Sequence, residues 1–378
     1  MKNFYLLFSN VEYQHLFKDV FLVPYYIKKH ASINKSYIVF PETNKNIDLP
    51  KFYKGINLIR LKNFRKSIKI PTTFFFLTFM FRNRKDMDVL MLFHLSMQSF
   101  ILGAFYKILK KDGFLYIKTD GEVWLNNTAS LLTSKQHFFK KFLIKFVLRK
   151  VNLISIESKA GFELLNKYPF NNLISSENIT SLPNGFDEEE FKSFKIDEKN
   201  FEEKDNLIIT VGRLGSYEKN TEMLLSALEK VDLKDWKVIC IGNIEKEEQD
   251  FQQKINDFYT NNPHLKSKVE FTGKINDRRK LYEYYNKAKI FVLTSRYEGF
   301  CLSLVEAARF KNIILSTDVG GAVDVAEISD LIYLYQDDPV DLALKLQKCI
   351  DGEIRIDKNN NAAVFSYDNA VQQSILKL

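Results

Sequence analysis

Cysteines and long apolar runs are scarce in this chain of 378 residues. The three cysteines, Cys240, Cys301 and Cys349, are odd in number and widely spaced, which excludes a disulfide framework, argues against a zinc site and predicts a reducing cytoplasm. The most apolar segment, 72–81 (TTFFFLTFMF), has ten residues, whereas about 20 are needed to cross a bilayer. Polar residues interrupt the N-terminal apolar run at once, so we expect a first strand there and neither a signal peptide nor a transmembrane segment.

The hydrophobic fraction of 46% is sufficient for ordinary cores, and the length favours two domains. The net charge of +8 would suit nucleic acid, acidic phospholipid or a phosphorylated small molecule. The sequence contains none of the recognised nucleic-acid-binding modules, so we expect no nucleic-acid partner.

Strand-like and helix-like segments alternate regularly in the second half. Short continuous apolar runs, such as 206–214 and 289–295, predict parallel strands that are buried on both faces. Amphipathic segments such as 278–288 predict the helices between them. This alternation is typical of βαβ units in a doubly wound sheet, so we expect a Rossmann-like domain over 186–363.

The first half shows the same alternation less clearly, with strand candidates between 3–9 and 151–158. A Pro-Asn-Gly turn followed by an acidic run, within 181–191, indicates a domain boundary. The sequence thus predicts an α/β protein with two Rossmann-like domains, 1–185 and 186–363. Two such domains in series would face each other across a cleft at the carboxyl ends of their strands, where these sheets bind ligands.

Two strand-to-helix loops in the second half contain unusual charged residues. The segment 211–220 (VGRLGSYEKN) places Arg213 and Lys219 near Gly212. Such a loop can offer backbone N–H groups, a helix N-terminus and cations to a phosphate, but two solvated loop cations would give the same pattern. In the second loop, Glu298 and Glu306 are separated by seven residues. These carboxylates could face a ligand.

A local explanation also exists for Glu306. The stretch from Ser303 to Glu306 has the form S-x-x-E of a helix capping box. In that interpretation Ser303 starts the helix and Glu306 lies in its first turn. The two interpretations are compatible, because a residue in the first turn can still reach a ligand.

Five motifs together resemble the retaining glycosyltransferases of family 4, which have the GT-B fold of two Rossmann-like domains. They occur in the order and at the spacings of that family: PNGFD (183–187), VGRL…KN (211–220), FTGKI (271–275), TSRYEGFCLSLVEA (294–307) and STDVGGAVD (316–324). The resemblance is strong over roughly 181–330 and fainter over the first half. It implies that the second domain binds the nucleotide-sugar donor and the first binds the acceptor. It also implies that a terminal helix, about 364–378, packs back on the first domain.

Carried onto this sequence, the resemblance assigns roles to four charged side chains. Glu298 would lie near the donor sugar, and Glu306 would accept hydrogen bonds from the ribose hydroxyls. Arg213 and Lys219 would neutralise the diphosphate. These cations and a helix dipole would stabilise the leaving nucleoside diphosphate, so the resemblance implies no cofactor and no metal.

The resemblance also assigns residues whose backbone would approach the donor phosphates. Cys301 stands where many relatives carry glycine, and Asp324 stands where glutamate is common. The backbone candidates are Gly212, Gly299, Phe300, Cys301, Leu302, Gly320 and Gly321.

The first domain offers weaker candidates. Asp120 ends the strand-like segment YIKTD, at a point where the family places a polar turn near the anomeric carbon, and is our candidate to receive the acceptor proton. Lys118 or Glu122 could do so instead, and a solvated turn would give the same pattern. His94 is a lesser candidate, because a lone histidine at a strand end is more often structural. The D-x-D sequence at 86–88 has the form of a metal site, but we interpret it as a turn before a strand.

A basic and aromatic segment suggests contact with anionic lipid. In 138–150 (FFKKFLIKFVLRK), Phe138, Phe142 and Phe146 recur at helical spacing beside Lys141 and Lys145. The segment 62–85 adds further basic and aromatic residues. Alternatively, the phenylalanines face a sheet and the lysines face water. We favour docking at the membrane, because acceptors in the resembled family are often lipid-linked.

The sequence therefore predicts a retaining glycosyltransferase that moves a hexose or N-acetylhexosamine from a nucleoside-diphosphate sugar, with UDP favoured. The acceptor would be a sugar, lipid-linked by resemblance, in cell-surface polysaccharide or glycoconjugate assembly. The expected location is cytoplasmic, at the inner face of the cell membrane. Two rivals remain: another GT-B sugar-nucleotide enzyme, such as an epimerase or a sucrose synthase-like enzyme, and a non-catalytic membrane- or partner-binding protein on the same scaffold.

Overall fold

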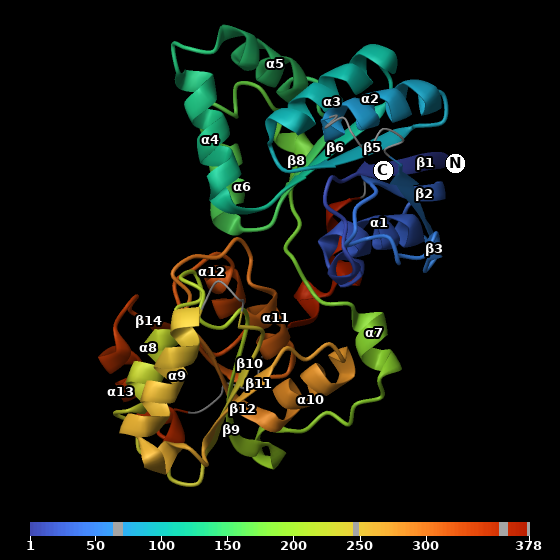
Figure 1. Ribbon diagram of the computed structural model, residues 1–378. Helices are drawn as coiled ribbons and strands as arrows, with labels where there is room; N and C mark the ends of the chain where they lie inside the picture. Colours follow the sequence, from blue (N-terminus) through green and yellow to red (C-terminus); the bar gives the residue numbers. More distant parts are fainter. Residues whose placement is uncertain (63–70, 245–248, 355–361, 376–378) are drawn as a thin grey trace. The chain divides into compact units, whose positions relative to one another are not determined.

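The computed structural model describes residues 1–62, 71–244, 249–354 and 362–375 (Figure 1). Its contacts divide the chain into two units. The first unit comprises Met1–Asp187 and the segment from Tyr367 onward, and the second comprises Glu188–Ser366.

The first unit contains an eight-stranded sheet in the order β3-β4-β2-β1-β5-β6-β7-β8. All neighbouring strands are parallel except β3 and β4. The chain runs outward from β1 to β4 and then returns to place β5 beside β1, so the strand order reverses between β1 and β5. The strands are β1 (Lys2–Leu7), β2 (Ile33–Pro41), β3 (Phe52–Tyr53), β4 (Ile56–Leu61), β5 (Val89–Phe93), β6 (Phe114–Thr119), β7 (Leu153–Ile156) and β8 (Ile179–Ser181).

Helices cover both faces of this sheet. Leu90 and Leu92 of β5 belong to one core, whereas Val89 and Met91 belong to the other, which explains the continuous apolar run of this strand. One core is completed by α2 (Thr72–Asn83), α3 (Met97–Leu109), α4 (Gly121–Thr133), α5 (Phe138–Leu148) and α6 (Lys159–Leu165), and the other by α1 (Asp19–His30) and α14 (Tyr367–Ser374).

The C-terminal helix α14 packs on α1. The Tyr367 amide donates to the carbonyl oxygen of Phe186 at 3.1 Å, and the Ser374 hydroxyl donates to that of Ser181 at 2.6 Å. Helix α14 is therefore part of the first unit although it follows the second unit in the sequence.

The second unit contains a six-stranded parallel sheet in the order β11-β10-β9-β12-β13-β14, which reverses between β9 and β12. Its strands are β9 (Asp205–Val211), β10 (Lys237–Ile241), β11 (Val269–Gly273), β12 (Ala288–Leu293), β13 (Ile313–Thr317) and β14 (Leu331–Leu334). The doubly wound parallel arrangement predicted from the sequence is confirmed in both units.

Helices also cover both faces of the second sheet (Figure 1). An apolar core joins one face to α8 (Thr221–Leu228), α9 (Gln249–Asn261) and α13 (Pro339–Ile350). On the other face lie α10 (Arg278–Lys287) and α11 (Leu302–Arg309), where the rings of Tyr282 and Tyr285 lie 5.7 and 5.9 Å from that of Phe310. Two shorter helices are α7 (Glu188–Ser193) and α12 (Ala322–Ala326).

Every helix in the described ranges falls short of the length and apolarity that a bilayer-spanning helix requires. The apolar segment 72–81 instead lies entirely in α2, where Phe76 and Met80 are buried in the core of the first unit.

Candidate functional site

The two charged loops of the second unit lie side by side, because they follow β9 and β12, the strands between which the sheet order reverses. The Thr294 hydroxyl donates to the carbonyl oxygens of Lys219 and Asn220 at 3.0 and 2.9 Å. The Arg296 amide donates to the carbonyl oxygen of Glu218 at 2.7 Å. Open parallel sheets bind ligands outside the carboxyl ends of their strands at this reversal. The fold thus places both loops where a ligand is expected.

Lys219 and Glu298 form the central ion pair of these loops. Lys219 Nζ lies 2.5 Å from Glu298 Oε1, and the Ser295 hydroxyl donates to the same oxygen at 2.6 Å. Burial lowers the pKa of Lys219, but electrostatic interactions with Cys301 and Glu298 have the larger, opposite effect. The pKa of Lys219 is therefore raised. A Cβ atom at Gly212 would lie 3.3 Å from Lys219 Cε, so glycine there leaves room for the lysine.

Arg213 belongs to the same loop but is held much less firmly. Its guanidinium lies 4.0 Å from the Glu218 carboxylate, and 59% of the side chain is exposed. A single exposed ion pair at this distance contributes little stability. Arg213 is therefore available to an anionic ligand.

Gly320 and Gly321, which follow β13, pack closely against the loop that contains Glu298. A Cβ atom at Gly320 would lie 2.1 Å from the carbonyl oxygen of Gly299 and 2.5 Å from that of Glu298. Gly321 has a φ of +82°, and its Cβ atom would lie 3.0 Å from the ring of Phe300. A Cβ atom at Gly299, by contrast, would meet no described atom within 4 Å. The loop is thus supported on one side and leaves the Gly299 backbone open.

Helix α11 begins two residues earlier than the capping-box interpretation requires, so that interpretation is wrong. Cys301 is the N-cap, Leu302 is the first helical residue, and the Leu304 amide donates to the Cys301 carbonyl oxygen at 3.1 Å. Ser303 is therefore the second helical residue and Glu306 the fifth. Burial, followed by the Glu298 charge, raises the pKa of the Cys301 thiol, which suits a neutral packing residue.

Glu306 lies on the α10 side of α11. Its Oε1 lies 3.9 Å from the Arg278 guanidinium, whose Nε donates to Glu190 at 2.7 Å. Burial and then the charge of Glu306 raise the pKa of Tyr285. Sequence reasoning did not single out Arg278, although its place directly after the N-cap Asp277 marks it as the start of α10.

In the first unit the structure pairs Asp120 with His94. Each follows one of two adjacent strands, β6 and β5, and His94 Nδ1 contacts Asp120 Oδ1. The His94 ring stacks on Trp124 with centroids 5.1 Å apart and planes 9° apart. Burial opposes the Asp120 charge, but the hydrogen bond and charge of His94, with the charge of Lys118, lower the pKa of Asp120.

The two alternatives to Asp120 differ in accessibility. Lys118 is fully buried, with its Nζ in contact with Glu157, 3.0 Å from Asp19 and 3.2 Å from Asn184. Glu122 is exposed in the first turn of α4. Lys118 therefore holds loops together inside the unit, whereas the Asp120–His94 pair reaches the surface.

Comparison with known proteins finds a family match within the second unit. Residues 191–363 match the family model of the glycosyl transferases group 1. The matched segment spans nearly all of the second unit. Lys219, Glu298 and Glu306 all lie inside the matched segment.

Two curated relatives match parts of the chain. The amylovoran biosynthesis glycosyltransferase AmsD of Erwinia amylovora is 30% identical over 151 residues, which cover 40% of this chain and 37% of that protein. The capsular polysaccharide biosynthesis glycosyltransferase CapM of Staphylococcus aureus is 25% identical over 233 residues, which cover 56% of this chain and 57% of CapM. The chain thus matches between about a third and somewhat over half of the length of these relatives.

Solved structures match almost the whole chain. The match to sucrose-phosphate synthase from Thermosynechococcus elongatus has a TM-score of 0.68 at 16% identity. It covers 99% of this chain and 97% of the synthase chain. The match to Anabaena HepE in complex with UDP has a TM-score of 0.65 at 15% identity. It covers 99% of this chain and 94% of the HepE chain. At these identities the likeness shows the fold, and the GT-B fold predicted from the sequence is confirmed.

The D-x-D sequence lies outside the segment that matches the group 1 family model and has a structural use. Asp88 Oδ1 accepts a hydrogen bond from Lys110 Nζ at 2.6 Å, and Oδ2 accepts one from the Asn3 amide at 2.9 Å. These bonds tie the start of β5 to β1 and to the end of α3. They support our interpretation of 86–88 as a turn before a strand.

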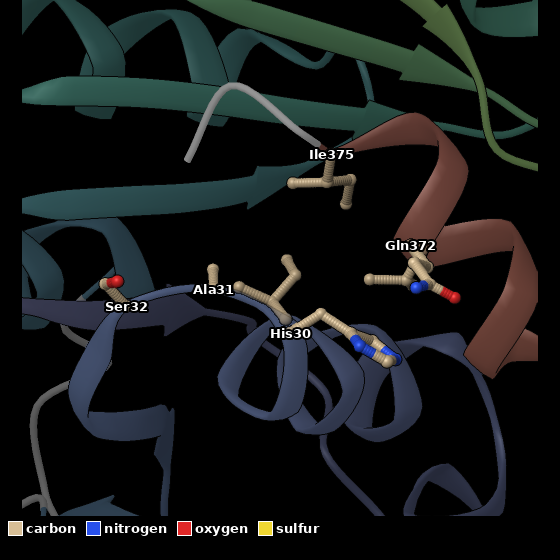
Figure 2. A pocket seen from close by; sticks show the side chains of 7 residues that line it. His30, Ala31, Ser32, Gln372 and Ile375 are labelled. Atoms are coloured by element: carbon tan, nitrogen blue, oxygen red, sulfur yellow. The ribbon is translucent and has the colours of Figure 1, made fainter.

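A cavity of about 320 Å³ in the first unit contains none of the predicted site residues. Figure 2 shows it between the end of α1 and α14, lined by residues that include His30, Ser32 and Gln372. Ser32 immediately precedes β2, so this cavity lies at the amino-terminal edge of the parallel sheet. Ligand sites in such sheets lie at the opposite edge.

Proposed function

We propose that the protein is a retaining glycosyltransferase. It moves a hexose or N-acetylhexosamine from a nucleoside-diphosphate sugar to a sugar acceptor in cell-surface polysaccharide or glycoconjugate assembly. The observation that carries this proposal is the meeting of Lys219, Glu298 and the open backbone of Gly299 at the strand reversal of the segment that matches the group 1 family model. The relatives AmsD and CapM, named for amylovoran and capsular polysaccharide biosynthesis, support a role in polysaccharide assembly.

UDP is the favoured nucleotide. Anabaena HepE, which shares the fold, has been solved with UDP and with UDP-glucose. The diphosphate would take Lys219 as its partner in place of Glu298 and would draw in the exposed Arg213. Glu298 would then be free to accept hydrogen bonds from hydroxyls of the donor sugar. Glu306 would bind the ribose.

The chemical step needs stabilisation of the leaving group. Breaking the sugar–phosphate bond builds negative charge on the nucleoside diphosphate, and preorganised cations and N–H groups stabilise such charge strongly. Lys219, Arg213 and the first N–H groups of α11, near Leu302, would supply them. These groups can act without a metal or another cofactor.

Asp120 and His94 would act on the acceptor. An imidazole that donates Nδ1–H to a carboxylate presents Nε2 as a base. The pair can therefore hold an acceptor hydroxyl and receive its proton. Asp120→Asn should slow transfer while leaving UDP affinity unchanged; weaker UDP binding would place Asp120 at the donor instead.

Calorimetric titration with UDP, GDP and ADP, each with EDTA present, tests the proposal. We expect micromolar binding of UDP that Lys219→Ala weakens at least about tenfold, because a charged hydrogen bond is lost. Binding of none of the three with EDTA, but of one with Mn²⁺, would overturn metal independence. Products formed from the donor without any acceptor sugar would favour an epimerase-type enzyme.

A further inference from the structure

Two helices of the first unit expose large apolar side chains along their outer faces. On α2, Phe74 and Phe81 are 55% and 53% exposed, and on α3, Ile101 and Ile108 are 39% and 67% exposed. Residues seven apart in a helix lie on the same face. Each helix therefore presents an apolar line on the side opposite to its core residues.

Helix α5 adds the most exposed apolar residues of this layer. Phe138, Phe139 and Phe142 are 74%, 86% and 66% exposed, whereas Phe146 is partly buried against the core. The expected stripe of Phe138, Phe142 and Phe146 is therefore outward-facing only in its first two members. The unexpected member is Phe139, which belongs to the same first turn.

The three helices form one continuous layer. Helix α2 packs against α3, and α3 packs against α5, and all three cover the same face of the sheet (Figure 1). Their outer faces therefore form a single surface, here termed the α2–α3–α5 face. Neighbouring helix axes lie about 8–10 Å apart, so the apolar lines on this face are close together.

The charge of the α2–α3–α5 face has one sign. The segments 72–83, 97–109 and 138–148 contain no aspartate or glutamate, and Arg82, Lys140, Lys141 and Lys145 supply their outward positive charge. Lys107 of α3 is buried and bonded to Gly113 and Asn152, so it adds no charge to this face. Residues 1–187 contain 28 lysines and arginines against 13 acidic residues, whereas 188–366 contain 26 against 33. The positive charge of the protein thus resides in the first unit. The basic segment 63–70 lies outside the described residues.

We propose that the α2–α3–α5 face docks on an anionic phospholipid bilayer. Exposed aromatic side chains combined with lysines and arginines are the chemistry of helices that lie in the membrane interface. The rings enter the acyl boundary, while each cation near the surface is attracted to acidic headgroups. A protein partner would not require the absence of acidic residues on all three helices, so charge complementarity favours the bilayer. The proposal does not depend on glycosyl transfer.

Vesicle co-sedimentation tests this directly. The full chain should bind phosphatidylcholine vesicles that contain phosphatidylglycerol and bind pure phosphatidylcholine vesicles far more weakly. Replacement of Phe138, Phe139 and Phe142 by alanine should lower the partition coefficient by roughly tenfold or more. These side chains are exposed, so the variant should keep its melting temperature.

Matched variants on other surfaces of the first unit provide the control. Replacement of Tyr13, Phe52 and Tyr168, which are 66%, 60% and 71% exposed, by alanine should change binding less than twofold. For charge, Lys140→Gln with Lys141→Gln should weaken binding to the acidic vesicles more than Lys35→Gln with Lys51→Gln does.

Three outcomes would overturn the proposal. The first is equal loss of binding in the face variants and the control variants. The second is vesicle binding that the phenylalanine variant leaves unchanged while heparin binds equally well, which would indicate a general polyanion surface. The third is the absence of vesicle binding together with self-association that the phenylalanine variant abolishes, which would indicate a contact between two copies.

Discussion

The carboxyl ends of the two sheets carry charged groups in opposite arrangements. In the second unit, Lys219 and Glu298 are 18% and 14% exposed, and Arg213 beside them is mostly in solvent. In the first unit, Lys118 and Glu157 are 0% and 1% exposed. The second unit therefore offers its central ion pair to a ligand, whereas the first unit encloses Lys118 and Glu157 and leaves Asp120 and His94 at the surface.

This difference shows what each cluster can do. A partly exposed ion pair can exchange its internal partner for a ligand, because water already solvates part of both groups. A buried cluster cannot do so, since removal of one partner leaves an uncompensated buried charge. Lys118, which contacts Asp19, Glu157 and Asn184, therefore fixes the loops of the first unit.

The largest expected effect comes from breaking the open cluster. Arg213→Ala with Lys219→Ala should reduce turnover by about 100-fold or more, because loss of one preorganised donor alone costs about that much. The melting temperature should also fall, because Glu298 is only 14% exposed and loses its ion-pair partner. Steady-state kinetics and thermal denaturation measure both. The exposed pair Lys237→Ala with Lys266→Ala is the control, and turnover near the wild-type value in the first double variant would remove both cations from the mechanism.

Two glycines of the open edge should separate stability from binding. Gly320→Ala forces a Cβ atom to within 2.1 Å of the Gly299 carbonyl oxygen, so we expect destabilisation by roughly 1–3 kcal/mol from overpacking. The Cβ atom added by Gly299→Ala would lie more than 4 Å from every described atom outside its two chain neighbours. This substitution should therefore leave the melting temperature unchanged. It should nevertheless weaken UDP binding, because the methyl group occupies the space proposed for the diphosphate. Normal UDP affinity in Gly299→Ala would show that the nucleotide lies elsewhere.

Glu306 should have a smaller effect on UDP binding, although its loss also removes a contact with Arg278. Glu306→Ala should weaken UDP binding by roughly 1–3 kcal/mol, through loss of charged hydrogen bonds to the ribose. Calorimetry with UDP measures the loss, and Glu283→Ala on the exposed side of α10 is the matched control. If uridine diphosphate and a ribose-free pyrophosphate lost affinity equally, the ribose assignment would be wrong.

Much of the second unit could be predicted from local sequence. Helix α13 (Pro339–Ile350) is an example, because Asp338 and Pro339 mark its start and Leu342, Leu346 and Ile350 repeat on one buried face. In the first unit the antiparallel pair of β3 and β4 was missed. Its two-residue turn, Lys54–Gly55, has positive φ at both positions, but Lys-Gly is a weaker hairpin signal than Asn-Gly or Asp-Gly.

The site was predictable only in part. Lys219 and Glu298 are 79 residues apart, and only the order of family motifs suggested that they act together. The pairing of His94 with Asp120 depends on the adjacency of β5 and β6, which no local pattern reveals. The cluster of Asp19, Lys118 and Glu157 draws on three distant segments, so its burial could not be inferred from any one of them.

A pH dependence of stability contrasts one buried group in each unit. In the first unit, burial raises the pKa of Glu157 from 4.5 to about 8, against the opposing effect of Lys118. In the second, burial lowers the pKa of Lys204 from 10.5 to about 7, assisted by Lys199. Lys204 Nζ donates to two carbonyl oxygens at the end of α10, which a neutral amine can also do.

These shifts predict opposite slopes. Between about pH 4.5 and 8 the folded chain holds a proton on Glu157 that the unfolded chain has lost, so this contribution to stability falls as the pH rises. Between about pH 7 and 10.5 the unfolded chain holds a proton on Lys204 that the folded chain has lost, so this contribution rises with pH. Melting temperatures of Glu157→Gln and Lys204→Met across pH 5–10 should each lose one slope relative to the wild type. Because Met also removes two hydrogen bonds, only the slope is diagnostic for Lys204, and curves parallel to the wild type in both variants would contradict the contrast between the two units.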